Sequence, residues 1–284
     1  MKKTLITATA VATVMSASAA YADLSLGGAL ARQINSGDGT SGISNTSTSS
    51  TINVDYTTTL NNGMGMAANT DITPSGAVYL LTVSSDMGSF FTGSDFASAV
   101  DSYDGAQGAG RYSGGGRILT SATAFNDGDA DSGNGFGIST SLAGASVSAT
   151  MGAGGNRALS IAGSMNIAGA TVKAGNTDFD TSGSPDHGFM TVGYSVGGFN
   201  LGWGHWDSDA TSMTQIGAST SVGGMGVGVT SASADNGAAA DTDAFGVHLS
   251  GDLGGAFWVV DYVNTDNGDG TESDDYTITF GTSF

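Results

Sequence analysis

Apolar and polar residues alternate over the last eleven residues of the chain, DDYTITFGTSF. Tyr276, Ile278 and Phe280 share one face with the terminal Phe284, and the residues between them are small or polar. A period of two is typical of a β-strand with one apolar face. The same alternation recurs in segments such as 52–57, 158–167, 190–196 and 245–250. Their polar faces are mostly Gly, Ser, Thr and Asn, which suits the wall of an enclosed space better than a Lys- and Glu-rich surface.

Five short Gly-containing motifs separate alternating segments in the second half of the chain: LAGA, IAGA, VGGF, VGGM and LGGA. They begin at Leu142, Ile167, Val196, Val222 and Leu253, so their starts are 25, 29, 26 and 31 residues apart. This leaves room for two strands of roughly 9–11 residues and a second, longer loop. Tight hairpin turns need Gly for positive φ. We expect an up-and-down meander with short turns at one end and longer, polar, acidic loops at the other.

The number of strands predicts how the sheet closes. Counting back from the C-terminus gives eleven strands down to 136–142, and five more precede them near 23–34, 49–60, 63–73, 76–85 and 88–95. Sixteen is an even number, so the last strand can pair with the first and leave no edge. The predicted fold class is all-β, a transmembrane antiparallel up-and-down β-barrel of 16 strands in a single domain, 23–284. We expect residues 96–135 to form one long internal loop and Phe284 to lie in an interfacial aromatic band.

The first residues have the three-part layout of a secretory signal. Lys2 and Lys3 precede an apolar run, and small residues close it at Ala22. We therefore expect a cleaved signal peptide, 1–22, and an exported protein. After Ala22 the formal charge is 5 − 26 = −21, which would repel phosphates and argues against a nucleic-acid partner.

Composition excludes several further classes. Cys is absent, so neither disulfides nor thiol chemistry is available. No stretch after Ala22 approaches the ~18 apolar residues of a membrane helix. With 47 Gly and 2 Pro, the chain is either a large all-β protein or a Gly/Ser-rich disordered one. The regular alternation favours the all-β protein.

Taken together, these residues resemble the sixteen-stranded general porins of Gram-negative outer membranes over the whole of 23–284. The resemblance depends on the opening LSLGGALARQ, the closing YTITFGTSF, the Gly-containing turns, and the long loop that follows SSDMGSFFTGSDFASAVDS. It implies that this loop folds inward and narrows the pore, and that the protein is a homotrimer. It also implies an outer-membrane location, contacts with lipid and lipopolysaccharide, and passage of small hydrophilic solutes.

In that family, acids on the inward loop face Arg and Lys on the barrel wall, and the resulting transverse field orients polar solutes. The corresponding acids here are Asp95, Asp101 and Asp104. Basic residues that could face these acids are few. Arg111 and Arg117 lie in the loop itself, Lys173 faces the lumen by alternation, and Arg157 borders a loop. Alternation places Arg32 on the face of Leu24, Leu26 and Leu30, although a bulge at Gly27 and Gly28 would reset it.

Alternation also places Asp55, Asp71, Asp261 and Asp275 on lumen faces. Charge of one sign sets the selectivity of a pore, and a negative field concentrates cations. We therefore predict a water-filled channel for passive diffusion that prefers cations. The alternative for any single loop Asp is an ordinary solvated residue.

The segment NDGDADSG spaces Asp127, Asp129 and Asp131 as in a calcium loop. Position six is Ser132 and position twelve is Ile138, where such loops carry Gly and Glu, so a flexible acidic loop is the alternative. No cofactor is required, and calcium is the one ion with a candidate site, where it would bridge loops to lipopolysaccharide.

The histidines, His187, His205 and His248, are scattered, and Asp186-His187 has no identifiable catalytic partner, so we predict no enzyme. Most of the aromatic residues fall on the outward face or beside a turn, where an interfacial girdle is expected. The alternative is sugar stacking in a saccharide-specific pore. The residues concerned are Trp203, Trp206, Trp258, Tyr194, Phe199 and Phe257.

Two other functions remain open at this stage. A secreted calcium-binding Gly/Asp-rich β-solenoid or adhesin would need a fixed short repeat, whereas the spacings here are unequal. A substrate-specific channel on the same barrel would need an aromatic track in the lumen.

Overall fold

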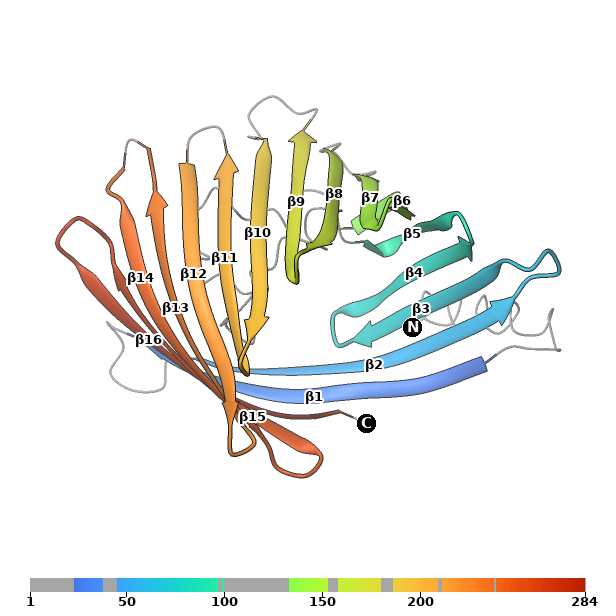
Figure 1. Ribbon diagram of the computed structural model, residues 1–284. Helices are drawn as coiled ribbons and strands as arrows, with labels where there is room; N and C mark the ends of the chain where they lie inside the picture. Colours follow the sequence, from blue (N-terminus) through green and yellow to red (C-terminus); the bar gives the residue numbers. More distant parts are fainter. Residues whose placement is uncertain are drawn as a thin grey trace.

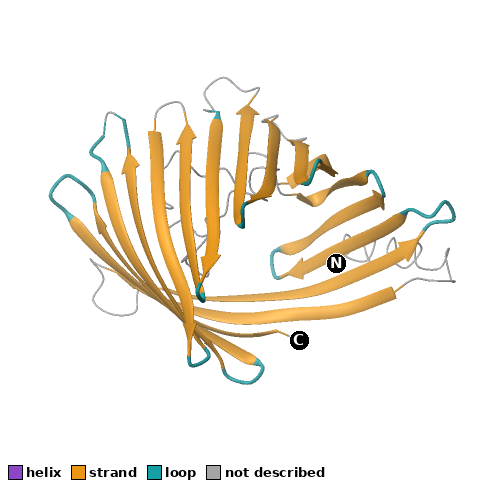
Figure 2. Cartoon of the chain, viewed as in Figure 1, coloured by secondary structure: helices purple, strands orange, loops and turns teal. Residues whose placement is uncertain are grey.

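The computed structural model describes residues 23–37, 45–96, 99, 133–152, 158–179, 186–208, 211–237 and 239–283. These residues form sixteen strands joined almost entirely by short connections (Figures 1 and 2). The first eight are β1 (Asp23–Gly37), β2 (Asn45–Thr59), β3 (Gly65–Thr73), β4 (Gly76–Ser85), β5 (Gly88–Phe96), β6 (Gly133–Leu142), β7 (Ala145–Gly152) and β8 (Ala158–Ile167). The other eight are β9 (Ala170–Phe179), β10 (His187–Val196), β11 (Phe199–Ser208), β12 (Thr211–Val222), β13 (Met225–Asp235), β14 (Thr242–Asp252), β15 (Ala256–Asp266) and β16 (Glu272–Ser283).

The sheet closes on itself as the sequence predicts. Every strand pairs antiparallel with its neighbours in the chain, and β1 pairs with β16 from Ala29 opposite Ser283 to Gly37 opposite Asp275. Figure 1 shows this closure where the blue start of the barrel lies beside its red end. A closed antiparallel ladder is not a stack of solenoid coils, so the solenoid alternative is wrong. The predicted strand ranges agree with the observed ones to within four residues, and the strands β5 and β6 extend slightly into the predicted 96–135 loop.

The tight turns at one end of the barrel have the geometry that their glycines require. In five of them both central residues have positive φ, as in the two-residue hairpin turns that match the twist of the strands. Two turns place Ala first, with φ of 51° at both Ala143 and Ala168, and Gly second. The turns at 197–198, 223–224 and 254–255 have Gly at both positions. These turns alternate with the connections at the opposite end, where the chain enters its longer loops.

The barrel exposes its apolar residues outward. Leu26, Ile138, Ile161 and Ile216 are among the many large apolar side chains with at least half of their surface exposed, and Leu26 reaches 71%. Their neighbours in sequence point to the interior, as the strict alternation demands. Within the described residues, no helix is long and apolar enough to cross a membrane.

Candidate channel lining

The inner wall is defined by the strand positions that alternate with the exposed apolar ones. On β2 and β3 it carries two acid–amide pairs, which lie directly opposite each other in the ladder. The Asn53 amide donates to the Asp71 carboxylate at 2.6 Å, and the Asn69 amide donates to the Asp55 carboxylate at 2.6 Å. Each amide holds a carboxylate against the wall without cancelling its charge. Asp55 and Asp71 therefore lie where alternation predicted, at neighbouring positions on one patch of the lumen.

A third inward carboxylate belongs to Asp261 on β15, which alternation also placed in the lumen. It is buried, and its Oδ1 lies 2.8 Å from Nδ1 of His248 on the adjacent strand β14. No sequence signal joins these two residues, which are directly opposed only through the register of β14 and β15. Asp186, by contrast, accepts a hydrogen bond from the Phe179 backbone N–H. Among the described residues, Asp261 and His248 thus form an acid–His pair across two strands.

Basic side chains are scarce on the described inner wall. Lys173 on β9 faces inward between Ser164 and Thr191, and it is the only Lys or Arg to do so in the part of the chain that the structure describes. Arg32 lies on the outer face: β1 pairs without a register shift on both sides, and Arg32 is opposite the exposed Phe280. The bulge that would have turned it inward does not form. The described wall therefore carries an excess of carboxylates.

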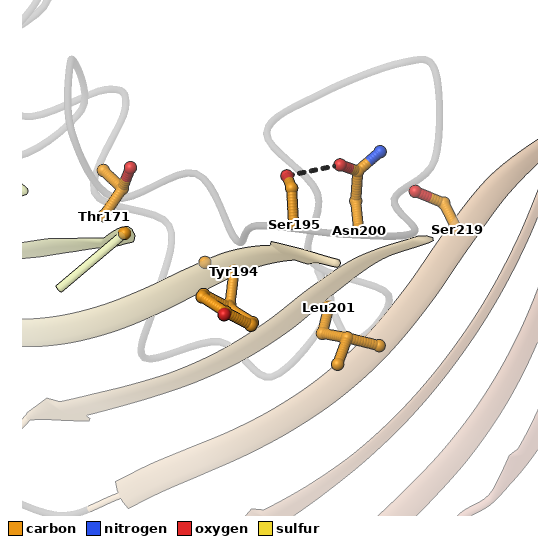
Figure 3. Close-up of a pocket in the computed structure, with 8 residues that line it drawn as sticks. Thr171, Tyr194, Ser195, Asn200, Leu201 and Ser219 are labelled. Atoms are coloured by element: carbon orange, nitrogen blue, oxygen red, sulfur yellow. Dashed lines mark hydrogen bonds between the residues drawn. The ribbon is translucent and has the colours of Figure 1, made fainter. Parts of the chain in front are cut away.

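Uncharged hydrogen-bonding side chains line the inner wall near the short turns of β9 to β12. A hollow of about 260 Å³ there is bordered by Thr171, Ser195, Asn200 and Ser219 (Figure 3). The Ser195 hydroxyl donates to the Asn200 side-chain oxygen at 2.7 Å. Tyr194 and Leu201 point away from these polar groups, toward the outer face. Such a surface is wettable.

Several of the aromatic residues follow the prediction of an outer girdle. Trp203 lies on the outward face of β11, with its ring stacked on His205 at 6.3 Å between centroids. Tyr194 and Phe199 are exposed outward as well. Trp258 shares this face, since it is directly opposite the exposed Phe280 in the ladder of β15 and β16.

Two aromatic residues are corrections to that prediction. Trp206 is three positions beyond Trp203, faces the interior and is only 2% exposed. Phe257 also faces inward, where its ring covers Gly281. An odd separation along a strand places two side chains on opposite faces, so the girdle assignment could not hold for both tryptophans of β11.

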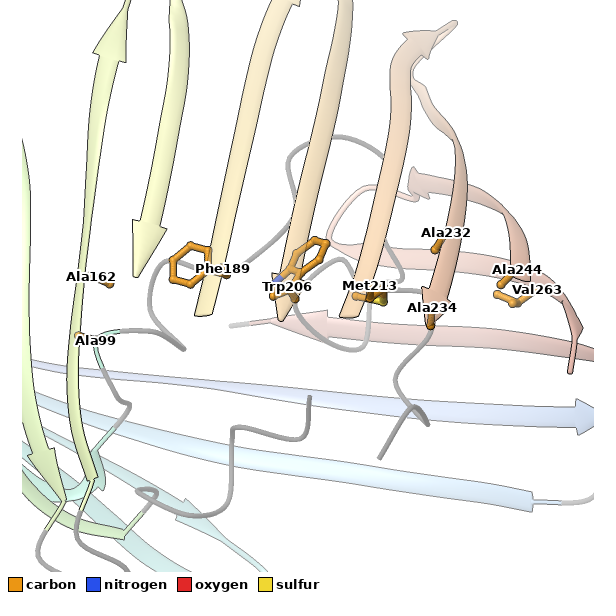
Figure 4. Packing of buried hydrophobic residues seen from close by; sticks show 9 residues of the cluster. All are labelled: Ala99, Ala162, Phe189, Trp206, Met213, Ala232, Ala234, Ala244 and Val263. Carbon is orange, nitrogen blue, oxygen red and sulfur yellow. The ribbon is translucent and has the colours of Figure 1, made fainter. Parts of the chain in front are cut away.

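Trp206 belongs to a larger set of inward apolar side chains that the sequence interpretation missed. Phe189, Trp206 and Met213 are directly opposite one another across β10, β11 and β12. They form a single buried cluster with small apolar residues (Figure 4): Ala99, Ala162, Ala232, Ala234, Ala244 and Val263. Alternation alone places these two side chains on the inner face. Trp206 is an even number of residues from the inward Asn200, and Met213 is an even number from the inward Gln215. That Phe189, Trp206 and Met213 are neighbours follows only from the register of the paired strands.

Several predicted residues fall outside the described part of the chain. They are Asp101, Asp104, Arg111, Arg117, Asp127, Asp129, Asp131, Arg157 and Phe284, together with the side chain of Asp95. The calcium hypothesis for residues 127–131 therefore stays a prediction. Among the residues that are described, no group of three or more His, Asp or Glu side chains could hold a metal ion.

The loop between β15 and β16 fixes one carboxylate outside the barrel wall. Asp269 accepts hydrogen bonds from the hydroxyl and from the backbone N–H of Thr271. Both bonds favour the ionised form, so they lower the pKa of Asp269 below its ordinary value of 3.8. This loop therefore keeps its negative charge in mildly acidic solution.

Solved outer-membrane proteins share this architecture over nearly the whole chain. OmpT, an outer membrane protein of Vibrio cholerae solved in a trimer form, matches with a TM-score of 0.68 and 14% identity, covering 93% of this chain and 100% of that chain. An engineered mutant of the porin from Rh. blastica matches with a TM-score of 0.66 and 15% identity, covering 92% and 100%. The anion-selective porin from Comamonas acidovorans matches with a TM-score of 0.64 and 13% identity, covering 93% and 100%.

The likeness is one of structure and not of sequence. No protein-family model and no curated protein matches the chain by sequence. Identities of 13–15% are evidence for the fold alone. With its closed ladder and outward apolar face, the chain has the sixteen-stranded outer-membrane barrel fold of the Gram-negative porins.

Proposed function

We propose that the protein is an outer-membrane porin, a water-filled channel for passive diffusion of small hydrophilic solutes and ions. The observation that carries this proposal is the division of the wall. Large apolar side chains are exposed outward around the closed barrel, while Asn, Ser, Thr and Asp line its interior. In water the outer face would be an apolar patch far larger than soluble proteins tolerate. In a bilayer it meets lipid tails, as in transmembrane barrels.

The channel prefers cations. On the described wall, Asp55, Asp71 and Asp275 face the lumen, and each contributes one negative charge. Lys173 is the one basic side chain on that wall. Carboxylates of this number raise the local concentration of cations and lower that of anions. The porin from Comamonas acidovorans is described as anion-selective, so the fold alone does not determine the sign. The side chains on the wall do.

The assembly is a homotrimer in a membrane that contains lipopolysaccharide. Support comes from the trimer form of the similar Vibrio cholerae protein. A substrate-specific channel is the second candidate, because the lumen contains aromatic residues after all. Phe189 and Trp206, however, are 5% and 2% exposed, so they offer no stacking surface to a passing sugar.

Planar-bilayer recording tests the proposal. Purified protein should give large, stable conductance steps that occur in threes, and a salt gradient should give a reversal potential of the sign expected for cation preference. An absence of conductance, under conditions where a known porin inserts, would refute the channel. A reversal potential of anionic sign would refute the charge argument and leave the channel intact.

A further inference from the structure

A shallow apolar hollow lies on the outer face of the barrel across β12, β13 and β14, which are neighbours in the sheet (Figure 1). Its volume is about 220 Å³, and its lining includes the outward side chains of Ile216, Ala218, Val229, Ser231 and Phe245. Ser231 lies directly opposite both Ile216 and Phe245 in the ladders, and Ala218 lies opposite Val229. Small side chains therefore form the floor of the hollow, and large side chains form its edges.

The hollow lies in the part of the outer wall that faces lipid. Ile216, Val229 and Phe245 are all exposed, so neighbouring molecules of the membrane reach them. An empty hollow would leave these side chains without partners on one side and would forfeit dispersion energy. An apolar cavity of about 150 Å³ is large enough for benzene, so this hollow accommodates several methylene groups. A flexible acyl chain can bend into it.

The outer face becomes polar directly beyond the hollow, toward the longer loops. Thr214, Ser233 and Asp243 occupy consecutive ladder positions on β12, β13 and β14, and all three are exposed. Asp243 is two residues from Phe245, which is ~7 Å along the strand. Two hydroxyls and a carboxylate thus lie within reach of the head group of a lipid whose chain occupies the hollow.

Two more carboxylates adjoin this polar edge. Asp266 on β15 lies directly opposite Asp243, and Asp235 is two residues beyond Ser233 on β13. Both are exposed on the outer face. Among the described outward residues of β9 to β16 there is no Lys or Arg, so nothing on this part of the wall offsets the three negative charges. The edge of the hollow therefore favours a cationic partner.

We propose that the hollow and its acidic edge form a seat for one membrane lipid whose head group carries a primary ammonium. This lipid seat rests on the membrane position of the proposed channel. The acyl chain fills the hollow, and the hydroxyls of Thr214 and Ser233 donate to oxygens of the head group. The ammonium donates its three N–H groups to Asp235 and Asp243. A quaternary ammonium has no N–H to donate, and the carboxylates repel an anionic head group.

A second copy of the chain fits the lipid seat less well than a lipid does. The described outer face carries one Lys or Arg, which is Arg32, and it lies opposite the exposed Phe280 in an apolar part of the wall. One cation cannot neutralise three carboxylates, whereas every ammonium lipid brings its own charge. Charge complementarity therefore favours the lipid.

Trp203 is a natural reporter of the lipid seat, because it lies directly opposite Ile216 on the neighbouring strand β11. The chain has three Trp residues, and the variant Trp206→Phe/Trp258→Phe retains Trp203 alone. The protein is folded into phosphatidylcholine vesicles that contain EDTA and a fixed share of one lipid with brominated chains. This lipid has an ethanolamine, choline or glycerol head group, and its chains are the same in all three cases.

The matched control is Trp203→Phe/Trp206→Phe, which retains Trp258. Trp258 also lies on the outer face, but it is opposite Gly251, six residues along β14 from Phe245. That separation is ~20 Å, so Trp258 reports the lipid around the barrel away from the seat.

Brominated phosphatidylethanolamine should quench Trp203 about threefold more effectively than brominated phosphatidylcholine, a modest factor because exposed charge pairs are individually weak. Brominated phosphatidylglycerol should quench it least, and Trp258 should respond equally to all three. Equal quenching of Trp203 by the three lipids would overturn the lipid seat. So would a Trp203 that no brominated lipid quenches, since protein would then cover the hollow. A preference for phosphatidylglycerol that appears only when calcium replaces EDTA, with no preference for phosphatidylethanolamine in EDTA, would overturn it in favour of a metal-bridged phosphate.

Two further changes in the Trp203 reporter separate the head group from the chain. Asp235→Asn/Asp243→Asn keeps the shape of the edge and should abolish the preference for phosphatidylethanolamine over phosphatidylcholine, while both lipids still quench. Ser231→Leu fills the hollow and should weaken the preference, whereas Ala174→Leu on the outer face of β9 should not. A preference retained in the double Asn variant would overturn the proposal.

The quenching is independent of conductance. Conductance steps without a head-group preference at Trp203 would leave the channel proposal standing and overturn the lipid seat. A head-group preference in a protein that gives no conductance would support the lipid seat and refute the channel.

Discussion

Neutralising the acid–amide pairs tests where ion selectivity originates. The double substitution Asp55→Asn/Asp71→Asn replaces each carboxylate with an amide of the same shape. The partners Asn53 and Asn69 remain in place, and an Asn–Asn pair can keep one hydrogen bond across the strands. The change therefore removes two negative charges from the lumen while it leaves the wall and the pore diameter as they are.

The size of the effect follows from Coulomb's law. Asp55 and Asp71 occupy diagonal positions of the β2–β3 ladder, so one hydrated cation can lie ~5 Å from both. Each carboxylate then contributes about 0.8 kcal/mol in water. Screening at 0.1 M salt removes roughly 40% of this. About 1 kcal/mol is left for the pair, which corresponds to a roughly fivefold enrichment of cations. Each single variant should lose about half of this free energy.

Reversal potentials across a tenfold salt gradient measure this directly. The parent should show cation preference, the double variant should move most of the way toward a non-selective pore, and the two single variants should lie between them. Asp207→Asn makes the same charge change on the outer face of β11 and should have little effect. If the double variant kept the parent's reversal potential, ions would not pass close to the β2–β3 wall, and the assignment of selectivity to these two carboxylates would be wrong.

Three further predictions concern stability and protonation. Ala143→Gly should raise the free energy of unfolding by about 0.5–1 kcal/mol in urea titrations, because Ala143 has a φ of 51°, a conformation costly for Ala and easy for Gly. His248→Ala should cost about 1–3 kcal/mol, because it leaves the buried Asp261 carboxylate without its His partner, and adding Asp261→Ala should recover most of that loss. Asp269, with its lowered pKa, stabilises the loop above pH 3.8 and loses this contribution as the pH falls through its folded pKa. In NMR titrations Thr271→Ala should raise the pKa of Asp269 toward 3.8.

The sequence was enough to predict the barrel because each of its elements is a local signal. Alternation reports strand and face within about ten residues, and motifs such as LAGA and VGGM report turns that require positive φ. The observed turns at Ala143–Gly144 and Gly223–Gly224 have that geometry. Closure follows from the even number of strands, and that number is obtained by counting the alternating segments one by one. A fold made by pairing each strand with its neighbour in sequence leaves little for long-range information to decide.

The contacts that matter for the channel depend on register, which alternation does not give. Alternation put Asp261 on the lumen face, but only the offset between β14 and β15 brings His248 beside it. The same holds for Asn53 with Asp71 and for Asn69 with Asp55 on β2 and β3. A one-residue slip would turn each of these side chains to the opposite face. The pairs are therefore properties of the folded ladder.

For Trp206, the general rule that aromatic residues lie in the outer girdle gave the wrong face, although the alternation along the strand gave the right one. Aromatic residues are common in the girdles of membrane barrels, and this rule assigned Trp203 and Trp206 together. The two residues are three positions apart on one strand, so they must lie on opposite faces. The glycine at 204, directly beside the Trp206 ring on the inner face, was the available sign that a large side chain needed room there.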